Sequence, residues 1–165
     1  MKKFIILLFL IIPMGLFAQD VKLAYVNTQE LFFAMPEYSA METQLADLNS
    51  KYENELRQME EEYRNKYTAY IAQQDSLTDN IKMRRMQEIE DIRSRMENFV
   101  PVAQQDVQTQ QSALIQPIQQ KLRDAINAVG SENGYTCIID PAAMLYMGSN
   151  VIDATPLVRA KLGLR

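Results

Sequence analysis

The sequence predicts an α+β protein in which a long antiparallel helical hairpin projects from a small β body. No proline occurs between Pro36 and Pro101 and no glycine between Gly15 and Gly130, so helix-breaking residues are missing from an unusually long stretch. Apolar residues recur within it at helical spacing, as a narrow stripe on an otherwise charged surface. From Gly130 onward, glycines separate short apolar segments typical of strands and turns.

The first 18 residues have the pattern of a secretory signal peptide. Lys2 and Lys3 form a positive n-region, an apolar run extends from Phe4 to Leu16, and Ala18 ends a small-residue junction. The apolar run is too short to span a bilayer comfortably, although an uncleaved membrane anchor is the alternative. Loss of both lysines lowers the formal charge from −4 to −6. This acidic balance disfavours nucleic acid as a partner, because phosphate binding needs clustered Lys and Arg.

Residues 19–36 are expected to form the first piece of the β body. Residues 22–27 have the composition of a short strand, and Thr28 is placed to cap a following helical turn. Pro36 suits the first position of the next helix, and Glu37 suits its first turn because a helix N-terminus attracts negative charge.

Residues 37–117 are predicted to form the arm, with its tip near residues 73–79. Ser76 and Asp79 have the spacing of a capping box that would start a second helix after the chain reverses. A single unbroken helix is the alternative, but its apolar stripe would have no partner within the chain. Pro101 and Pro117 fall in the returning helix and flank a glutamine-rich section. They act either as a flexible joint or as two tolerated kinks.

Residues 118–165 are expected to complete the body. Residues 135–140 and 144–147 are predicted to be strands, and Thr155 is predicted to cap a last helix that ends at Gly163. Cys137 lies in the first of these strands and is expected to be a small buried hydrophobe. Three short strands make too little core for one chain and leave open sheet edges, so we expect an oligomer.

The sequence offers little for enzyme chemistry. It has no histidine and one cysteine, and its acidic runs lie on a predicted exposed helix. We therefore expect no enzymatic activity, no catalytic residue, no metal site and no cofactor, and we expect a binding function instead.

Three segments of the chain resemble the Skp/OmpH family of periplasmic chaperones for outer-membrane proteins. They are Leu23–Asn27 with the following Leu31 and Phe32, the charged hairpin, and residues 118–162, especially 135–140. The resemblance implies a homotrimer whose strands form a central barrel, with three arms around a cavity that holds unfolded outer-membrane proteins without ATP. It also implies a periplasmic location. Family members are often basic whereas this chain is acidic, and residues 104–116 have no match to a basic lipopolysaccharide cluster proposed in the family.

The predicted function is therefore that of a holdase that binds unfolded outer-membrane proteins between its arms. A structural coiled-coil adaptor for one folded envelope partner is the alternative. Peripheral contact with a membrane is left open, and no transmembrane segment is expected once the leader is removed. Met and Tyr suit promiscuous apolar binding, so we predict client contacts at Met59, Tyr70, Met83 and Met86. The oligomer core is predicted at Leu23, Tyr25, Ile138 and Leu145.

Overall fold

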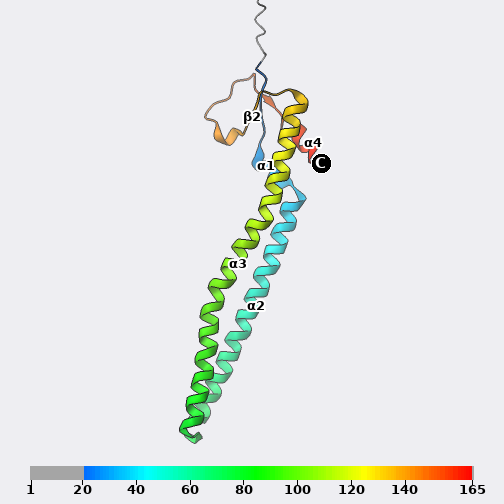
Figure 1. The fold of residues 1–165 in the computed structure, drawn as a ribbon. Helices are drawn as coiled ribbons and strands as arrows, with labels where there is room; N and C mark the ends of the chain where they lie inside the picture. Colours follow the sequence, from blue (N-terminus) through cyan, green and yellow to red (C-terminus); the bar gives the residue numbers. More distant parts are fainter. Residues whose placement is uncertain (1–20, 165) are drawn as a thin grey trace, which may run out of the picture.

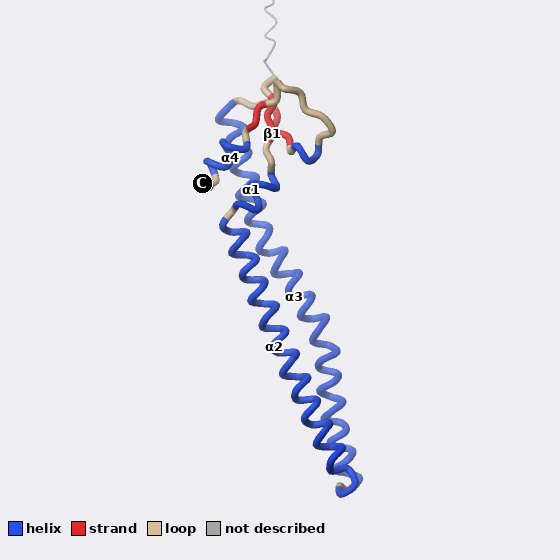
Figure 2. The backbone as a smooth tube through the Cα atoms, turned by 180° about the vertical axis from the view of Figure 1, so that it is seen from behind, coloured by secondary structure: helices blue, strands red, loops and turns tan. Residues whose placement is uncertain are grey.

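A long helical arm and a small body make up the computed structural model, which describes residues 21–164 (Figure 1). The arm consists of α2 (Pro36–Gln73) and α3 (Asp79–Asn133), joined by the short 3-10 turn η1 (Gln74–Ser76). The two helices run side by side in opposite directions in both views (Figures 1 and 2). With 55 residues against 38, α3 outruns α2, and its last turns pack into the body.

The chain reversal at the tip has a different cap from the one predicted. The helix α3 starts after Thr78, which forms no side-chain cap. Ser76 Oγ instead donates a hydrogen bond of 2.8 Å to the carbonyl of Gln73, which closes the turn behind it. The predicted capping box is therefore wrong. At the other end, α3 stops where Gly134 takes the left-handed conformation with φ 63°, which glycine adopts without steric cost.

The helix α3 continues through Pro101 and Pro117. Each proline removes one backbone hydrogen bond, so the helix is locally weaker at both positions. The flexible joint and the pair of tolerated kinks both stay predictions.

The body contains a three-stranded parallel sheet in the order β2-β1-β3. The strand β1 (Leu23–Tyr25) is central, with β2 (Cys137–Ile139) and β3 (Ile152–Asp153) on either side. The predicted strand at residues 144–147 is wrong, because that segment belongs to the loop that protrudes from the sheet in Figure 2. A third parallel strand needs a crossover, and the chain uses η2 (Pro141–Ala143) and this loop to bring residue 152 back beside β1.

Two short helices pack against α3 in the body, and their caps differ from the predicted ones. Asn27, not Thr28, caps α1 (Thr28–Ala34), because its side chain accepts a hydrogen bond from the backbone N–H of Glu30 at 3.1 Å. Thr155 lies inside the first turn of α4 (Thr155–Lys161), and its hydroxyl accepts a hydrogen bond from the N–H of Asn27 at 3.1 Å. This bond ties the end of β1 to the start of α4.

The core lies where the body meets the base of the arm. Leu31 of α1 and Val158 of α4 have no exposed surface, and the end of α3 completes the cluster. The buried members are contributed by β1, both short helices, both arm helices and the residues that flank them: Ala24, Val26, Leu31, Met35, Met41, Ile118, Leu122, Ala125, Val129, Ala154 and Val158.

One face of the sheet is left open by this core. Ala24 is fully buried, whereas its neighbours Leu23 and Tyr25 point to the other face and are only half-buried. Cys137 pairs with Leu23 and is exposed, so the prediction of a buried cysteine is wrong for the single chain. Its position on the open face of an edge strand explains the exposure.

Two residues predicted for the oligomer core differ in their environment. Ile138 packs against the chain's own core, and Leu145 in the protruding loop is completely exposed. The oligomer core made of these residues with Leu23 and Tyr25 stays a prediction, as does the division at residues 36 and 117.

The predicted leader lies outside the described residues. Within residues 21–164, no helix is both long and apolar enough to cross a membrane.

Candidate functional site

The two helices of the arm bury few apolar side chains between them. Outside the body core, Ile89, Ile92 and Ala103 of α3 are the buried apolar side chains of residues 21–164. Of the four predicted client-contacting residues, Met59 and Tyr70 are half-buried, whereas Met83 and Met86 have exposed fractions of 68% and 47%. Met83 and Met86 are therefore exposed on the surface of α3.

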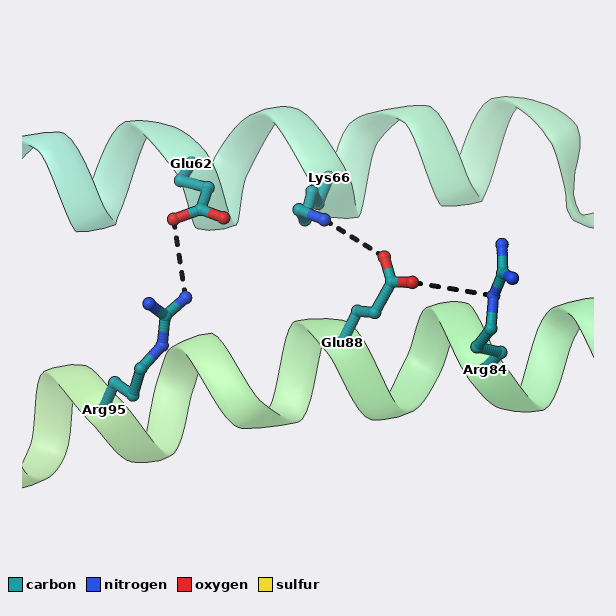
Figure 3. Close-up of polar contacts among 5 residues, drawn as sticks. All are labelled: Glu62, Lys66, Arg84, Glu88 and Arg95. Carbon is teal, nitrogen blue, oxygen red and sulfur yellow. Dashed lines mark hydrogen bonds and ion pairs between the residues drawn. The ribbon is translucent and has the colours of Figure 1, made fainter.

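Ion pairs join the two helices along one side of the tip half. Lys66 Nζ lies 3.0 Å from Glu88, which also contacts Arg84 at 3.6 Å, and Arg95 lies 3.5 Å from Glu62 (Figure 3). The hydrogen bond from Lys66 lowers the pKa of Glu88. Residues four apart share a side of a helix, so these contacts define one side of the arm. We call it the ion-pair side.

Exposed apolar side chains occupy the opposite side of the same half. Met86 is two residues from both Arg84 and Glu88, about 200° around the helix from each. On α2, Tyr67 and Ile71 are one and five residues beyond Lys66 and are each 46% exposed. We call Tyr67, Ile71, Met83 and Met86 the tip patch, and the side that carries it the open side. Tyr67 also stacks on Tyr63, with ring centroids 6.0 Å apart.

An apolar groove lies farther toward the body on the open side. Its volume is about 350 Å³, and it runs between residues 49–56 of α2 and residues 99–108 of α3. We call it the mid-arm groove. Its apolar walls come from Tyr52, Leu56, Phe99, Val100, Ala103 and Val107. On α3, the tip patch and the mid-arm groove lie on one row of residues at helical spacing, with steps of three and four residues. The row consists of Met83, Met86, Glu90, Arg93, Glu97, Val100 and Gln104.

A polar contact holds the two walls of the mid-arm groove together. The Tyr52 hydroxyl donates a hydrogen bond of 2.6 Å to Asp106, and the Tyr52 ring packs edge-on against Phe99 with centroids 5.8 Å apart. The hydrogen bond to the Asp106 carboxylate raises the pKa of Tyr52. Asp106 is the one charged residue of the glutamine-rich section and so has a structural role.

Charge is unevenly distributed along the arm. Residues 63–96, around the tip, carry seven basic and five acidic side chains. The half nearer the body, residues 37–62 and 97–120, carries ten acidic side chains against Lys51 and Arg57: Glu37, Glu42, Asp47, Glu53, Glu55, Glu60, Glu61, Glu62, Glu97 and Asp106. The mid-arm groove therefore lies in a negative region, which the net charge alone does not reveal.

Comparisons with known proteins agree with this architecture. The family model described as Outer membrane protein (OmpH-like) matches residues 22–162. The chain belongs to the OmpH-like family. A relative from Pectobacterium atrosepticum, named Chaperone protein Skp, is 29% identical over 137 residues, which are 81% of each chain. The resemblance inferred from the sequence is therefore confirmed, and the family supports a chaperone role.

The fold of this OmpH-like chain also has a crystallographic counterpart. An OmpH-like outer membrane chaperone from Caulobacter crescentus superposes with a TM-score of 0.76 at 14% identity, covering 85% of this chain and 82% of the other. At that identity the match supports the fold, with its long helices and small sheet.

Sequence reasoning missed Tyr67, Ile71 and the mid-arm groove as parts of the open side. Tyr67 falls on the apolar stripe of the sequence, and such a stripe identifies the inner face of a hairpin but not its flanks. The signal that could have found the open side is the spacing of Glu62, Lys66, Glu88 and Arg95, since cross-arm ion pairs fix the opposite side.

Proposed function

We propose that this OmpH-like protein is an ATP-independent periplasmic holdase, which binds unfolded outer-membrane proteins between helical arms and prevents their aggregation. The observation that carries the proposal is the tip patch. Four large apolar side chains stay exposed on one side of a narrow arm, and the other side carries ion pairs between the two helices. A folded protein rarely leaves such a row uncovered without a binding role.

The chemistry of the tip patch suits clients without a fixed shape. Methionine is unbranched and polarizable, so Met83 and Met86 adapt to different apolar partners. Tyrosine adds a broad ring with a polar hydroxyl. Contacts of this kind scale with buried apolar area and need no defined sequence in the client.

We also propose that the protein works as a homotrimer. Support comes from the open face of the sheet, where Leu23 and Tyr25 are half-buried and Cys137 is exposed, and from Leu145 and Tyr146 in the protruding loop. Among residues 21–164, neither outer strand has a further partner on its other edge, and such edges invite pairing with another copy. A trimer would bring three arms together around a shared space and give weak single contacts the benefit of multivalency.

Light scattering tests the proposed function directly. An unfolded outer-membrane β-barrel protein is diluted from urea into buffer without nucleotide, with or without the chaperone, while native mass spectrometry reports the oligomeric state. Suppressed scattering of several unrelated β-barrel clients is expected, with a trimer as the active species. Suppression absent for all clients, together with stable binding of one folded envelope protein, would favour the adaptor and overturn the holdase.

A further inference from the structure

The mid-arm groove has the size of a short extended segment rather than of a folded partner. It runs from residue 49 to 56 of α2 and from residue 99 to 108 of α3, which are seven and nine helical steps, or roughly 10–14 Å at 1.5 Å per step. An extended chain rises about 3.3 Å per residue, so about four residues fill this length. Alternate side chains of such a segment point to one side and would enter the apolar floor together.

The rim of the groove is polar and suits an extended backbone. Asn49 on one wall and Gln104 and Gln108 on the other carry amides that can both donate and accept hydrogen bonds. An unfolded segment brings unpaired backbone N–H and C=O groups, which these amides can satisfy. A helical ligand satisfies its own backbone and would gain less from this rim.

The charge around the groove is one-sided. Glu53 is the charged residue among those that line it, and the surrounding half of the arm has ten acidic and two basic side chains. A segment that carries Lys or Arg is therefore attracted, and one that carries Asp or Glu is repelled. The tip patch lies in a region with no such acidic excess.

We infer that the mid-arm groove binds a short extended client segment whose apolar side chains are flanked by Lys or Arg. The inference rests on the proposed holdase function and adds a specificity to it. The tip patch takes apolar segments regardless of charge, and the groove selects the cationic ones among them. A client is then held at two places on the open side of one arm.

The test is an NMR titration of the full-length trimeric protein with two hexapeptides. Both have the same four apolar residues, flanked by Lys in one peptide and by Glu in the other. Shifts of the amide signals of Ala103 and Gln104 are expected with the Lys peptide, with binding about tenfold tighter than for the Glu peptide because both flanking charges change sign in the acidic field.

Two pairs of variants locate the binding site. Val100→Asp places a charge in the groove and should weaken binding of the Lys peptide about tenfold, while Val102→Asp, on an exposed position two residues away that does not line the groove, should leave it unchanged. Glu53→Lys should remove the preference for the Lys peptide. Glu55→Lys, on the same helix and outside the groove, should retain most of it.

Each result decides the inference. Equal binding of both peptides, shifts confined to the tip patch, or equal losses in Val100→Asp and Val102→Asp would overturn it. Groove signals that move on dilution without peptide would show that a second copy occupies the groove, which also overturns it. Light scattering with an unfolded β-barrel protein separates the two proposals. If the chaperone suppresses aggregation while the peptides fail to bind the groove, the holdase stands and the groove assignment falls.

Discussion

The body and the arm of this protein bury apolar surface in different ways. In the body, five elements converge on one core, where Leu31 and Val158 are fully enclosed. In the arm, two helices share a strip whose buried members are Ile89, Ile92 and Ala103, and large side chains such as Met83 stay exposed. The body thus encloses its apolar side chains within the chain, whereas the arm leaves large apolar side chains exposed.

The largest expected effect comes from the core of the body. Leu31→Ala should lower the free energy of unfolding by roughly 3–5 kcal/mol, because it removes a fully buried side chain from a core of several elements. Leu157→Ala is the matched control, since Leu157 also lies in a seven-residue helix of the body but is 41% exposed. Urea unfolding followed by circular dichroism compares the two variants. Equal destabilisation would show that the body is not organised around this core.

A smaller and more local effect is expected in the arm. Ile92→Ala should destabilise the pairing of α2 and α3 by roughly 2–4 kcal/mol, since Ile92 is only 2% exposed. Hydrogen exchange should accelerate in the tip half while protection of the body stays as it is. Ile71→Ala, at a 46% exposed position, should change exchange little. Faster exchange throughout the body would contradict the separation of the two regions.

Shortening the arm should leave the body intact. Removal of residues 63–89 keeps Glu62 opposite Arg95 and leaves residues 90–94 to form the new turn. The body core lies outside the deleted segment, so the thermal transition of the body and the oligomer should persist, while client holding weakens with the loss of the tip patch. Collapse of the oligomer on this deletion would show that the arms hold it together.

The smallest effect concerns pH. The hydrogen bond from Lys66 lowers the pKa of Glu88 in the folded arm. The ionised Glu88 therefore stabilises the folded arm at any pH above the ordinary glutamate pKa of about 4.3. That contribution is lost as the pH falls through the lowered value. Glu88→Gln should therefore have a slightly lower melting temperature than the unmodified protein at pH 7, and this difference should shrink as the pH falls below the ordinary glutamate pKa. A difference that grows toward low pH would contradict this sign.

Sequence patterns predicted the arm well because helices are local structures. The absence of glycine and proline from one stretch and the apolar stripe on it indicated two long helices and a turn near residues 73–79, and α2 and α3 meet at Gln74–Thr78. The body was predicted less well. Residues 144–147 have strand composition, but parallel pairing with β1 depends on a crossover and selects Ile152–Asp153 instead.

The exposed side of the arm could be predicted only in part, because it depends on how the two helices pack. Residue type alone pointed to Met83 and Met86, which are exposed, and also to Met59 and Tyr70, which are half-buried between the helices. Which flank of a hairpin stays open depends on cross-arm pairs such as Lys66 with Glu88, and these form only when the register of the two helices is known. The mid-arm groove likewise needs both helices in place.

The most direct test of the claim that the arm holds clients by apolar contact compares the client affinity of two double variants at the tip. Met83→Ser/Met86→Ser removes apolar surface from the open side, and Arg84→Gln/Arg85→Gln removes two neighbouring charges. Affinity for an unfolded β-barrel protein of acidic net charge is measured at low and moderate salt. The methionine variant should bind more weakly than the arginine variant, and salt should change either affinity little, because apolar contact survives the screening of exposed charges. A steep loss of affinity with salt, or a larger loss in the arginine variant, would show that the arm holds clients by charge and would contradict the account.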